Sequence, residues 1–115
     1  MISRELNALM LKNFPYLKEK YVEEITWQEG EDTGSHIIYG DVFTPYLKKC
    51  IEEKKKDDIV CVFLFLESVL ELDDQYANEV LSFSVFESIV HLLKIEKDIY
   101  NLLGSKSKKI VEELV

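Results

Sequence analysis

The sequence has very little arginine. Arg4 is the only one among 14 basic residues, and these face 22 acidic residues, so the formal net charge is −8. A chain this acidic does not bind nucleic acid by neutralising phosphates, and one guanidinium cannot supply a set of bidentate phosphate contacts. Apolar residues make up 47% of the chain, which excludes a disordered protein.

Long hydrophobic runs are also missing. The longest is Ile59 to Leu66, far short of the ~20 residues that a membrane-spanning helix needs. Near the N-terminus only Ala8 to Leu11 is apolar, whereas a secretory signal needs about 7–15 such residues. We therefore expect no membrane contact, no signal peptide and a cytoplasmic location.

Cysteine is scarce too. Cys50 and Cys61 are the only two, and they lack the close spacing of a zinc or redox pair. Both fall in apolar stretches, which predicts two free, buried thiols in a reducing compartment. A disulfide between them is the alternative.

Apolar residues recur at helical spacing through most of the chain, which predicts an all-α protein with a single domain over residues 1–115. Short connections favour either a HEAT-like α-solenoid or a compact orthogonal bundle, with successive helices packed in pairs. About seven helices are expected, over residues 3–12, 15–27, 41–54, 57–72, 74–93, 96–103 and 105–114.

Two segments are ambiguous. Residues 59–66 have the β-branched and aromatic content of a buried strand, but the apolar pattern continues to Leu72, which favours a central helix buried on all sides. Residues 36–39 fit a loop or a marginal strand, since no second strand is available to pair with them.

Helix ends have recognisable signals. Asp41 is expected to cap the third helix, Gly104 to end the sixth and Ser105 to cap the last. Ser84 is one of several small residues at helical spacing that would let a neighbouring helix approach closely.

Catalytic motifs are absent. The sequence has no HExxH motif, no phosphate-binding glycine loop and no nucleophile elbow. His36 with Glu31, Asp32 and Asp41 is the one conceivable metal cluster, and a solvated acidic loop is the simpler interpretation. We expect no metal, no cofactor and no enzyme activity.

Three other side chains have a catalytic alternative. Glu67 and Glu87 interrupt apolar helices and could act as a general acid and base. The simpler expectation is that each reaches solvent or caps a neighbouring helix. His91 is expected to be partly buried and hydrogen-bonded.

The acidic residues are concentrated in residues 29–41 and 57–74, neither of which contains lysine or arginine. Ordinary helix caps and solvated faces would account for part of this, whereas a functional interpretation is a surface that attracts a basic partner. The candidate partner-binding residues are Glu29, Glu31, Asp32, Tyr39, Asp41, Tyr46, Glu67, Glu71, Asp73 and Asp74.

Aromatic residues lie in or beside the first acidic segment, and such residues are enriched at the centres of interfaces. Tyr39 and Tyr46 are the better interface candidates because their hydroxyls tolerate a wet rim. Trp27 and Phe43 are expected to close the core under the loop.

The segment HIIYGDVFTPYL, residues 36–47, resembles a family of small bacterial HEAT-like helical proteins. The later stretches 66–74, 79–81 and 85–87 are similar to the second half of that family, so the resemblance covers about residues 10–95. Its motifs are structural. Similar small acidic proteins are immunity proteins of bacterial toxin systems, including contact-dependent inhibition.

This resemblance implies a protein that neutralises a toxin, but it supplies no toxin-contact residues. Together with the charge, it leads us to expect an immunity protein that covers the cationic active site of a basic toxin, such as a nuclease. A helical scaffold that binds a peptide in an apolar groove is the alternative, and the oligomeric state stays open.

Overall fold

Every regular element of the chain is helical, in agreement with the helical spacing of its apolar residues. The computed structural model describes all residues from Met1 to Val115, and it contains no strand, which confirms the all-α prediction. The elements are α1 (Ser3–Asn13), η1 (Pro15–Leu17), α2 (Lys18–Thr26), η2 (Gly30–Asp32), α3 (Ser35–Ile38), η3 (Tyr39–Phe43), α4 (Thr44–Glu52), α5 (Lys56–Leu70), α6 (Gln75–Val80), η4 (Leu81–Phe86), α7 (Glu87–Ile95), α8 (Lys97–Tyr100) and α9 (Ser105–Leu114).

Several of these elements join end to end. α3, η3 and α4 form one continuous helix over residues 35–52, and α6, η4 and α7 form another over residues 75–95. Their middle parts, η3 and η4, are π-helical. The prediction of a loop or strand at residues 36–39 is therefore wrong, and Asp41 lies inside a helix instead of capping one. Ile38 and Tyr39 are both fully buried, as the core-facing side of a helix.

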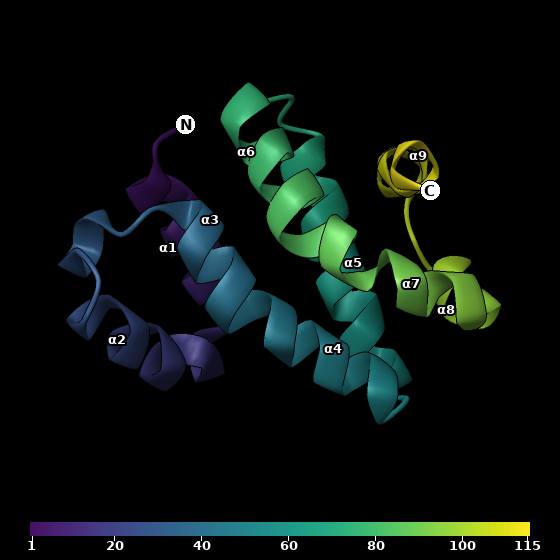
Figure 1. Ribbon diagram of the computed structural model, residues 1–115, viewed down its shortest axis with the longest axis horizontal. Coiled ribbons are helices and arrows are strands. Elements are labelled where there is room, and N and C mark those ends of the chain that lie inside the picture. The colour runs from purple at the N-terminus through teal and green to yellow at the C-terminus, as the bar shows by residue number, and fades with distance from the viewer.

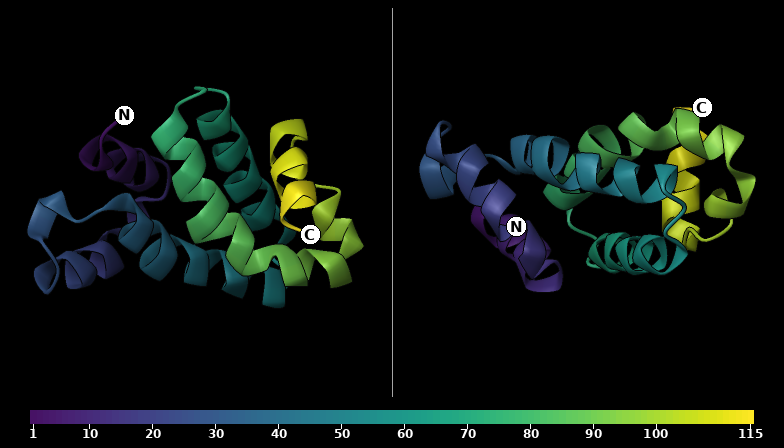
Figure 2. Two further views of the ribbon diagram at one scale, coloured as in Figure 1. Left: turned by 45° about the horizontal axis from the view of Figure 1, so that its top comes forward. Right: turned by 90° about the horizontal axis from the view of Figure 1, so that it is seen from below.

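The two continuous helices lie side by side (Figures 1 and 2). α1 and α2 pack against the α3–η3 part, and α5 packs against α4. α9 contacts α5, η4 and α7, and thereby closes the other end of the molecule. The radius of gyration is 13.4 Å, which agrees with the value of about 13 Å for a globular chain of this length and favours a compact bundle over an extended solenoid.

One cluster of 29 buried apolar side chains runs from Leu6 to Val111 and touches helices from both ends of the chain. α5 contributes to it but is not buried all round as predicted. Leu64 is 66% exposed, and Cys61 lies on the same outer face. Cys50 is buried and both thiols are free, so the prediction of two buried cysteines is correct only for Cys50.

Polar contacts of Thr44 and His36 with Ser84 connect η3 and its neighbouring turns to η4, and we call them the η3–η4 lock. Gly40 faces Ser84, whose Cβ would lie 4.0 Å from a Cβ added at the glycine. The Thr44 hydroxyl donates to the Ser84 carbonyl at 2.7 Å, and His36 Nδ1 lies 2.9 Å from the Ser84 hydroxyl. A π-helical turn disturbs the usual i→i−4 ladder, and a side-chain donor from the neighbouring helix can satisfy a carbonyl there. The expected close approach at Ser84 is confirmed.

α9 begins on a side chain from another helix. Glu67 of α5 accepts hydrogen bonds from the backbone N–H groups of Lys106 and Ser107, both at 3.0 Å, and from the Ser107 hydroxyl at 2.9 Å. Glu67 therefore caps a neighbouring helix, as the simpler expectation had it. Gly104 has φ −72°, so it does not end the preceding helix in the left-handed conformation typical of a terminating glycine. Gly104 instead lies against the Glu67 carboxyl group, and a Cβ added at this position would collide with that group.

Burial disfavours the charged form of Glu67, but the three hydrogen bonds outweigh it, so its pKa lies below the ordinary value. A lowered pKa in the folded state adds stability above the unfolded-state pKa, about 4.3, and this stability is lost as the pH falls through the folded-state pKa.

We predict that Glu67→Gln lowers the free energy of unfolding at neutral pH by about 1–2 kcal/mol, because a neutral amide is a weaker cap. The difference from the wild type should shrink as the pH falls through the pKa of Glu67. Urea denaturation at several pH values measures both effects. Glu113→Gln, on the exposed side of α9, is the control and should change stability by less than about 0.5 kcal/mol.

Gly104→Ala should displace the Glu67 carboxylate and lose the same cap, at a cost of about 1–2 kcal/mol. In a Glu67→Ala background the same substitution should cost much less, because the colliding carboxylate is gone. A double-mutant cycle in urea tests this coupling, and equal costs in both backgrounds would contradict it.

Thr44→Val should remove the hydroxyl that donates to the Ser84 carbonyl inside the contact of the two long helices. We expect a loss of about 1–3 kcal/mol in the free energy of unfolding. Thr26→Val, which removes a hydroxyl bonded only within its own exposed helix, is the matched control and should cost little. Equal losses would show that the η3–η4 lock adds nothing specific.

Candidate protein-binding surface

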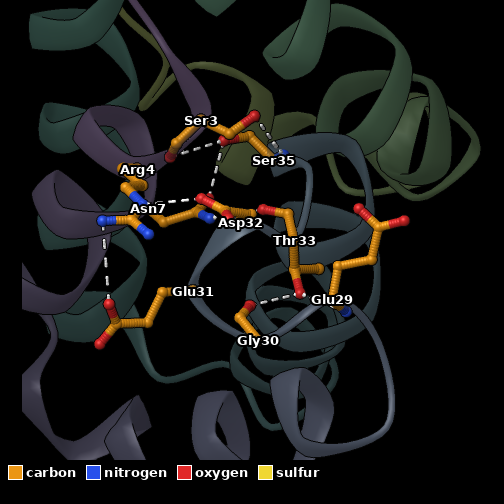
Figure 3. Close-up of polar contacts among 9 residues, drawn as sticks. All are labelled: Ser3, Arg4, Asn7, Glu29, Gly30, Glu31, Asp32, Thr33 and Ser35. Atoms are coloured by element: carbon orange, nitrogen blue, oxygen red, sulfur yellow. Dashed lines mark hydrogen bonds and ion pairs between the residues drawn. The ribbon is translucent and has the colours of Figure 1, made fainter.

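The acidic loop between α2 and α3 contains the first group of predicted interface residues. Arg4 of α1 reaches into it, with Nε 2.8 Å from Asp32 Oδ1 and a guanidinium nitrogen 3.9 Å from Glu31 Oε2 (Figure 3). Asp32 and Glu31 stay exposed, but they share the one guanidinium of the chain. Part of their charge is thus balanced from within the molecule.

A buried polar network fixes this loop against α1. The Asn7 amide donates to the Thr33 carbonyl at 3.1 Å, and the Ser35 hydroxyl donates to Asn7 Oδ1 at 2.7 Å. Thr33 also donates to the Gly30 carbonyl at 2.6 Å (Figure 3). Asn7, Thr33 and Ser35 are all buried and have partners, so the loop presents its acidic side chains from a fixed backbone.

Two side chains beside this loop remain unpaired. The Glu29 carboxylate points away from Arg4 (Figure 3), and no ion pair forms with it. Trp27 is 80% exposed at the C-terminal end of α2. The prediction that Trp27 closes the core is therefore wrong. The buried residues of η1 and α2 are Leu17 and Tyr21. Phe43, by contrast, is fully buried as predicted.

Glu24 and Asp41 bring two carboxyl groups together from different elements. Partial burial and the charge of Glu24 raise the pKa of Asp41 above its ordinary value. The Gln28 amide donates to Glu24 Oε2 at 3.0 Å, but no lysine or arginine forms an ion pair with either carboxylate. This pair of like charges has no balancing cation in the chain.

We use the name Trp27 face for four residues of α2, its C-terminal end, α3 and η3, namely Glu24, Trp27, Ile37 and Asp41. Trp27 follows Glu24 by three positions at the C-terminal end of α2, and Asp41 follows Ile37 by four positions where α3 continues into the π-helical η3. α2, which carries Glu24, contacts η3, which carries Asp41. Ile37 is 37% exposed. The face thus combines apolar side chains with unbalanced negative charge.

The two tyrosines predicted at an interface lie elsewhere. Tyr39 is fully buried, and its hydroxyl donates to the Leu6 carbonyl at 2.6 Å. Tyr39 cannot contact a partner protein, because its side chain is buried and its hydroxyl already bonds a backbone carbonyl. The prediction that this hydroxyl lies at the solvated rim of an interface is therefore wrong. Tyr46 is half-buried and pairs with the exposed Tyr16, the two hydroxyls being 2.7 Å apart.

The second acidic segment is largely occupied by structural roles. Glu67 caps α9, and Asp74 accepts from the Ala77 N–H at 2.9 Å and from the N-terminal amine at 2.7 Å. Glu71 and Asp73 are exposed at the turn between α5 and α6, and neither forms an ion pair. Of the predicted residues in this segment, only these two are free to meet a partner.

The residues considered for metal binding or catalysis do not come together. His36 bonds Ser84 and packs edge-on against Tyr76, and no group of three or more His, Cys, Asp or Glu side chains is placed to hold a metal ion. Glu87 is exposed at the start of α7, while Glu67 caps α9. His91 is exposed and forms no side-chain hydrogen bond, so the prediction of a partly buried, bonded histidine is wrong.

A shallow apolar groove lies at the opposite end of the molecule, between α7, α8 and α9. Its volume is about 440 Å³, and its walls include Val90, Leu93, Tyr100 and Val111.

No helix is both long and apolar enough to cross a membrane.

Sequence reasoning missed Glu24 and misplaced Trp27. For Trp27 the sequence did contain a signal of exposure. Trp27 lies beyond the apolar spacing set by Tyr21 and Ile25, and it directly precedes the polar residues Gln28 and Glu29. Glu24 gave no such signal, because its neighbour Asp41 comes from a distant part of the sequence.

Comparison with known proteins gives one result. No characterised protein and no solved structure matches the chain. A family model described as a domain of unknown function, DUF7674, matches residues 7–114, and therefore nearly the whole bundle from α1 to α9. The chain belongs to the DUF7674 family.

Proposed function

We propose that this protein binds a basic protein and neutralises it, as an immunity protein does with a bacterial toxin. The observation that carries the proposal is Trp27, the most exposed large hydrophobic side chain of the protein, set beside carboxylates that no internal cation balances. Burying an indole at an interface is strongly favourable, and tryptophan is among the residues that most often dominate binding energy.

Charge supports the same proposal. Glu24, Glu29 and Asp41 carry no ion pair, while the single arginine is held by Asp32 and Glu31. A negative surface of this kind accelerates the approach of a basic partner and disfavours acidic ones. The toxin relationship itself rests on the sequence resemblance, and a basic nuclease would have the required charge.

Neutralisation would proceed by occlusion. The acidic side chains take the places of nucleic-acid phosphates in the cationic cleft of the toxin, and the indole provides the apolar anchor. The network behind the loop keeps its backbone fixed before binding, so little conformational entropy is lost on association.

We predict that Trp27→Ala raises the dissociation constant for a basic toxin domain encoded by a neighbouring gene by about 30-fold or more, as expected for an interface hot spot. The toxin should also regain activity in its presence. Calorimetry and a toxin-activity assay measure the two effects.

Ile95→Ala is the matched control, because Ile95 is 76% exposed at the C-terminal end of α7, and α7 lies far from α2 in the bundle (Figure 1). It should change the dissociation constant by less than about twofold. Absence of any complex in gel filtration, together with undiminished toxin activity, would overturn the proposal.

The groove between α7, α8 and α9 favours a second candidate, a scaffold that holds a peptide. An apolar groove should bind with little dependence on salt, whereas the Trp27 face should weaken markedly as salt screens its charge. The salt dependence of binding to the natural partner therefore separates the two functions.

A further inference from the structure

A cleft between the α4–α5 turn and the junction of α7 with α8 has walls of opposite charge. Lys54 and Lys56 line one wall, and Glu96 and Asp98 line the other. The volume of the cleft is about 480 Å³, within the range of about 300–1,000 Å³ that is usual for small-molecule sites. None of these four side chains forms an ion pair, so the opposite charges do not meet across the cleft.

Backbone hydrogen bonds fix the lysine wall. The Lys55 N–H donates to the Cys50 carbonyl at 3.0 Å and the Lys54 N–H to the Ile51 carbonyl at 3.1 Å, which is the Schellman pattern at a helix end. Lys54 occupies the left-handed position of this motif, with φ 53°. The Lys55 ammonium pairs with Glu53 at 3.3 Å, whereas the lysines on either side of it line the cleft without an internal partner.

The acidic wall is arranged in a similar way. The Glu96 carbonyl accepts from the N–H groups of Ile99 and Tyr100, both at 3.0 Å, and this fixes the backbone where α8 begins. Glu96 and Asp98 line the cleft, whereas Lys97 between them lines the apolar groove of α7, α8 and α9. The nearest lysine in sequence therefore belongs to a different surface, and the acidic wall keeps its charge.

The remaining lining of the cleft is mostly apolar. Ile59 and Ile99 are buried, and Leu102 is half-buried. Asn101 adds an exposed side-chain amide, which can both donate to and accept from a peptide group. The cleft can therefore hold an apolar body between two charged ends.

A ligand with a single charge fits these walls poorly. An anion that meets the lysines would also lie beside the facing carboxylates, and a cation that meets the carboxylates would lie beside the lysines. A ligand with a carboxylate at one end and an ammonium at the other gains at both walls. Free amino acids and short peptides with unblocked ends have these two groups.

We infer that this cleft binds an apolar amino acid or short apolar peptide through its free ends. The ligand carboxylate lies at Lys54 and Lys56, its ammonium lies at Glu96 and Asp98, and its apolar side chains contact the floor of the cleft. The site is separate from the Trp27 face, so ligand binding there does not depend on the proposed binding of a toxin.

NMR titration of the ¹⁵N-labelled protein tests the site. The probes are leucine, leucyl-leucine, and leucyl-leucine that is N-acetylated, C-amidated or blocked at both ends. We expect leucyl-leucine to bind with a dissociation constant on the order of 1 mM and to shift the amide signals of residues 54–59 and 96–102. Each single block should weaken binding at least about threefold, and the double block should abolish it. Tighter binding of leucine than of leucyl-leucine would assign the cleft to a single amino acid.

Variants assign each end of the ligand to one wall. Lys56→Gln should weaken leucyl-leucine binding at least about threefold, but it should not change the binding of the amidated peptide, which has no carboxylate. Asp98→Asn should act in the same way on leucyl-leucine and not on the acetylated peptide. Lys12→Gln and Glu71→Gln remove the same charges from other exposed positions and should leave binding unchanged within error.

Three results would overturn the inference. The first is the absence of any shift in these signals at about 10 mM leucyl-leucine, tenfold above the expected dissociation constant. The second is equal binding of the free and the doubly blocked peptide, or shifts confined to the apolar groove of α7, α8 and α9. The third is an equal loss of binding in Lys56→Gln and Lys12→Gln. All four substituted side chains are exposed, and circular dichroism checks that the variants stay folded.

Discussion

The contact between η3 and η4 is the constraint on which the rest of the bundle depends. Gly40 of η3 lies opposite Ser84 of η4, and the Thr44 hydroxyl donates to the Ser84 carbonyl across this contact. α1 and α2 pack on one part of this pair, while α5 and α9 pack on the other. η3 also contacts α2, the helix that carries Glu24.

Some of the acidic side chains have a local use within the fold. Glu67 and Asp74 satisfy backbone N–H groups at helix starts, which are buried or half-buried positions where a carboxylate is well suited to the helix dipole. Asp32 and Glu31 hold Arg4, and Arg4 in turn ties the acidic loop to α1. Many other carboxylates, Glu24, Glu29 and Asp41 among them, form no ion pair within the chain.

The helical elements were largely predictable, because apolar periodicity and capping residues are local signals. The helix at residues 57–72 was correctly preferred to a strand, since its pattern continued too far for one. Residues 36–39 were misjudged as non-helical because two glycines flank them, although Gly34 precedes a helix start and Gly40 serves a close helix contact. Local composition cannot distinguish a glycine that ends an element from one that admits a neighbour.

The sequence by itself determined the fold class, the excess of negative charge and the absence of familiar catalytic motifs, since each depends on residue types and short spacings. Tertiary structure decided which polar groups remain available. It buried Tyr39 by giving its hydroxyl a backbone acceptor, and it exposed Trp27 because no helix covers the end of α2. It also packed α2, which carries Glu24, against η3, which carries Asp41. The physical reason is that exposure and charge balance depend on contacts between distant segments, which no local pattern contains.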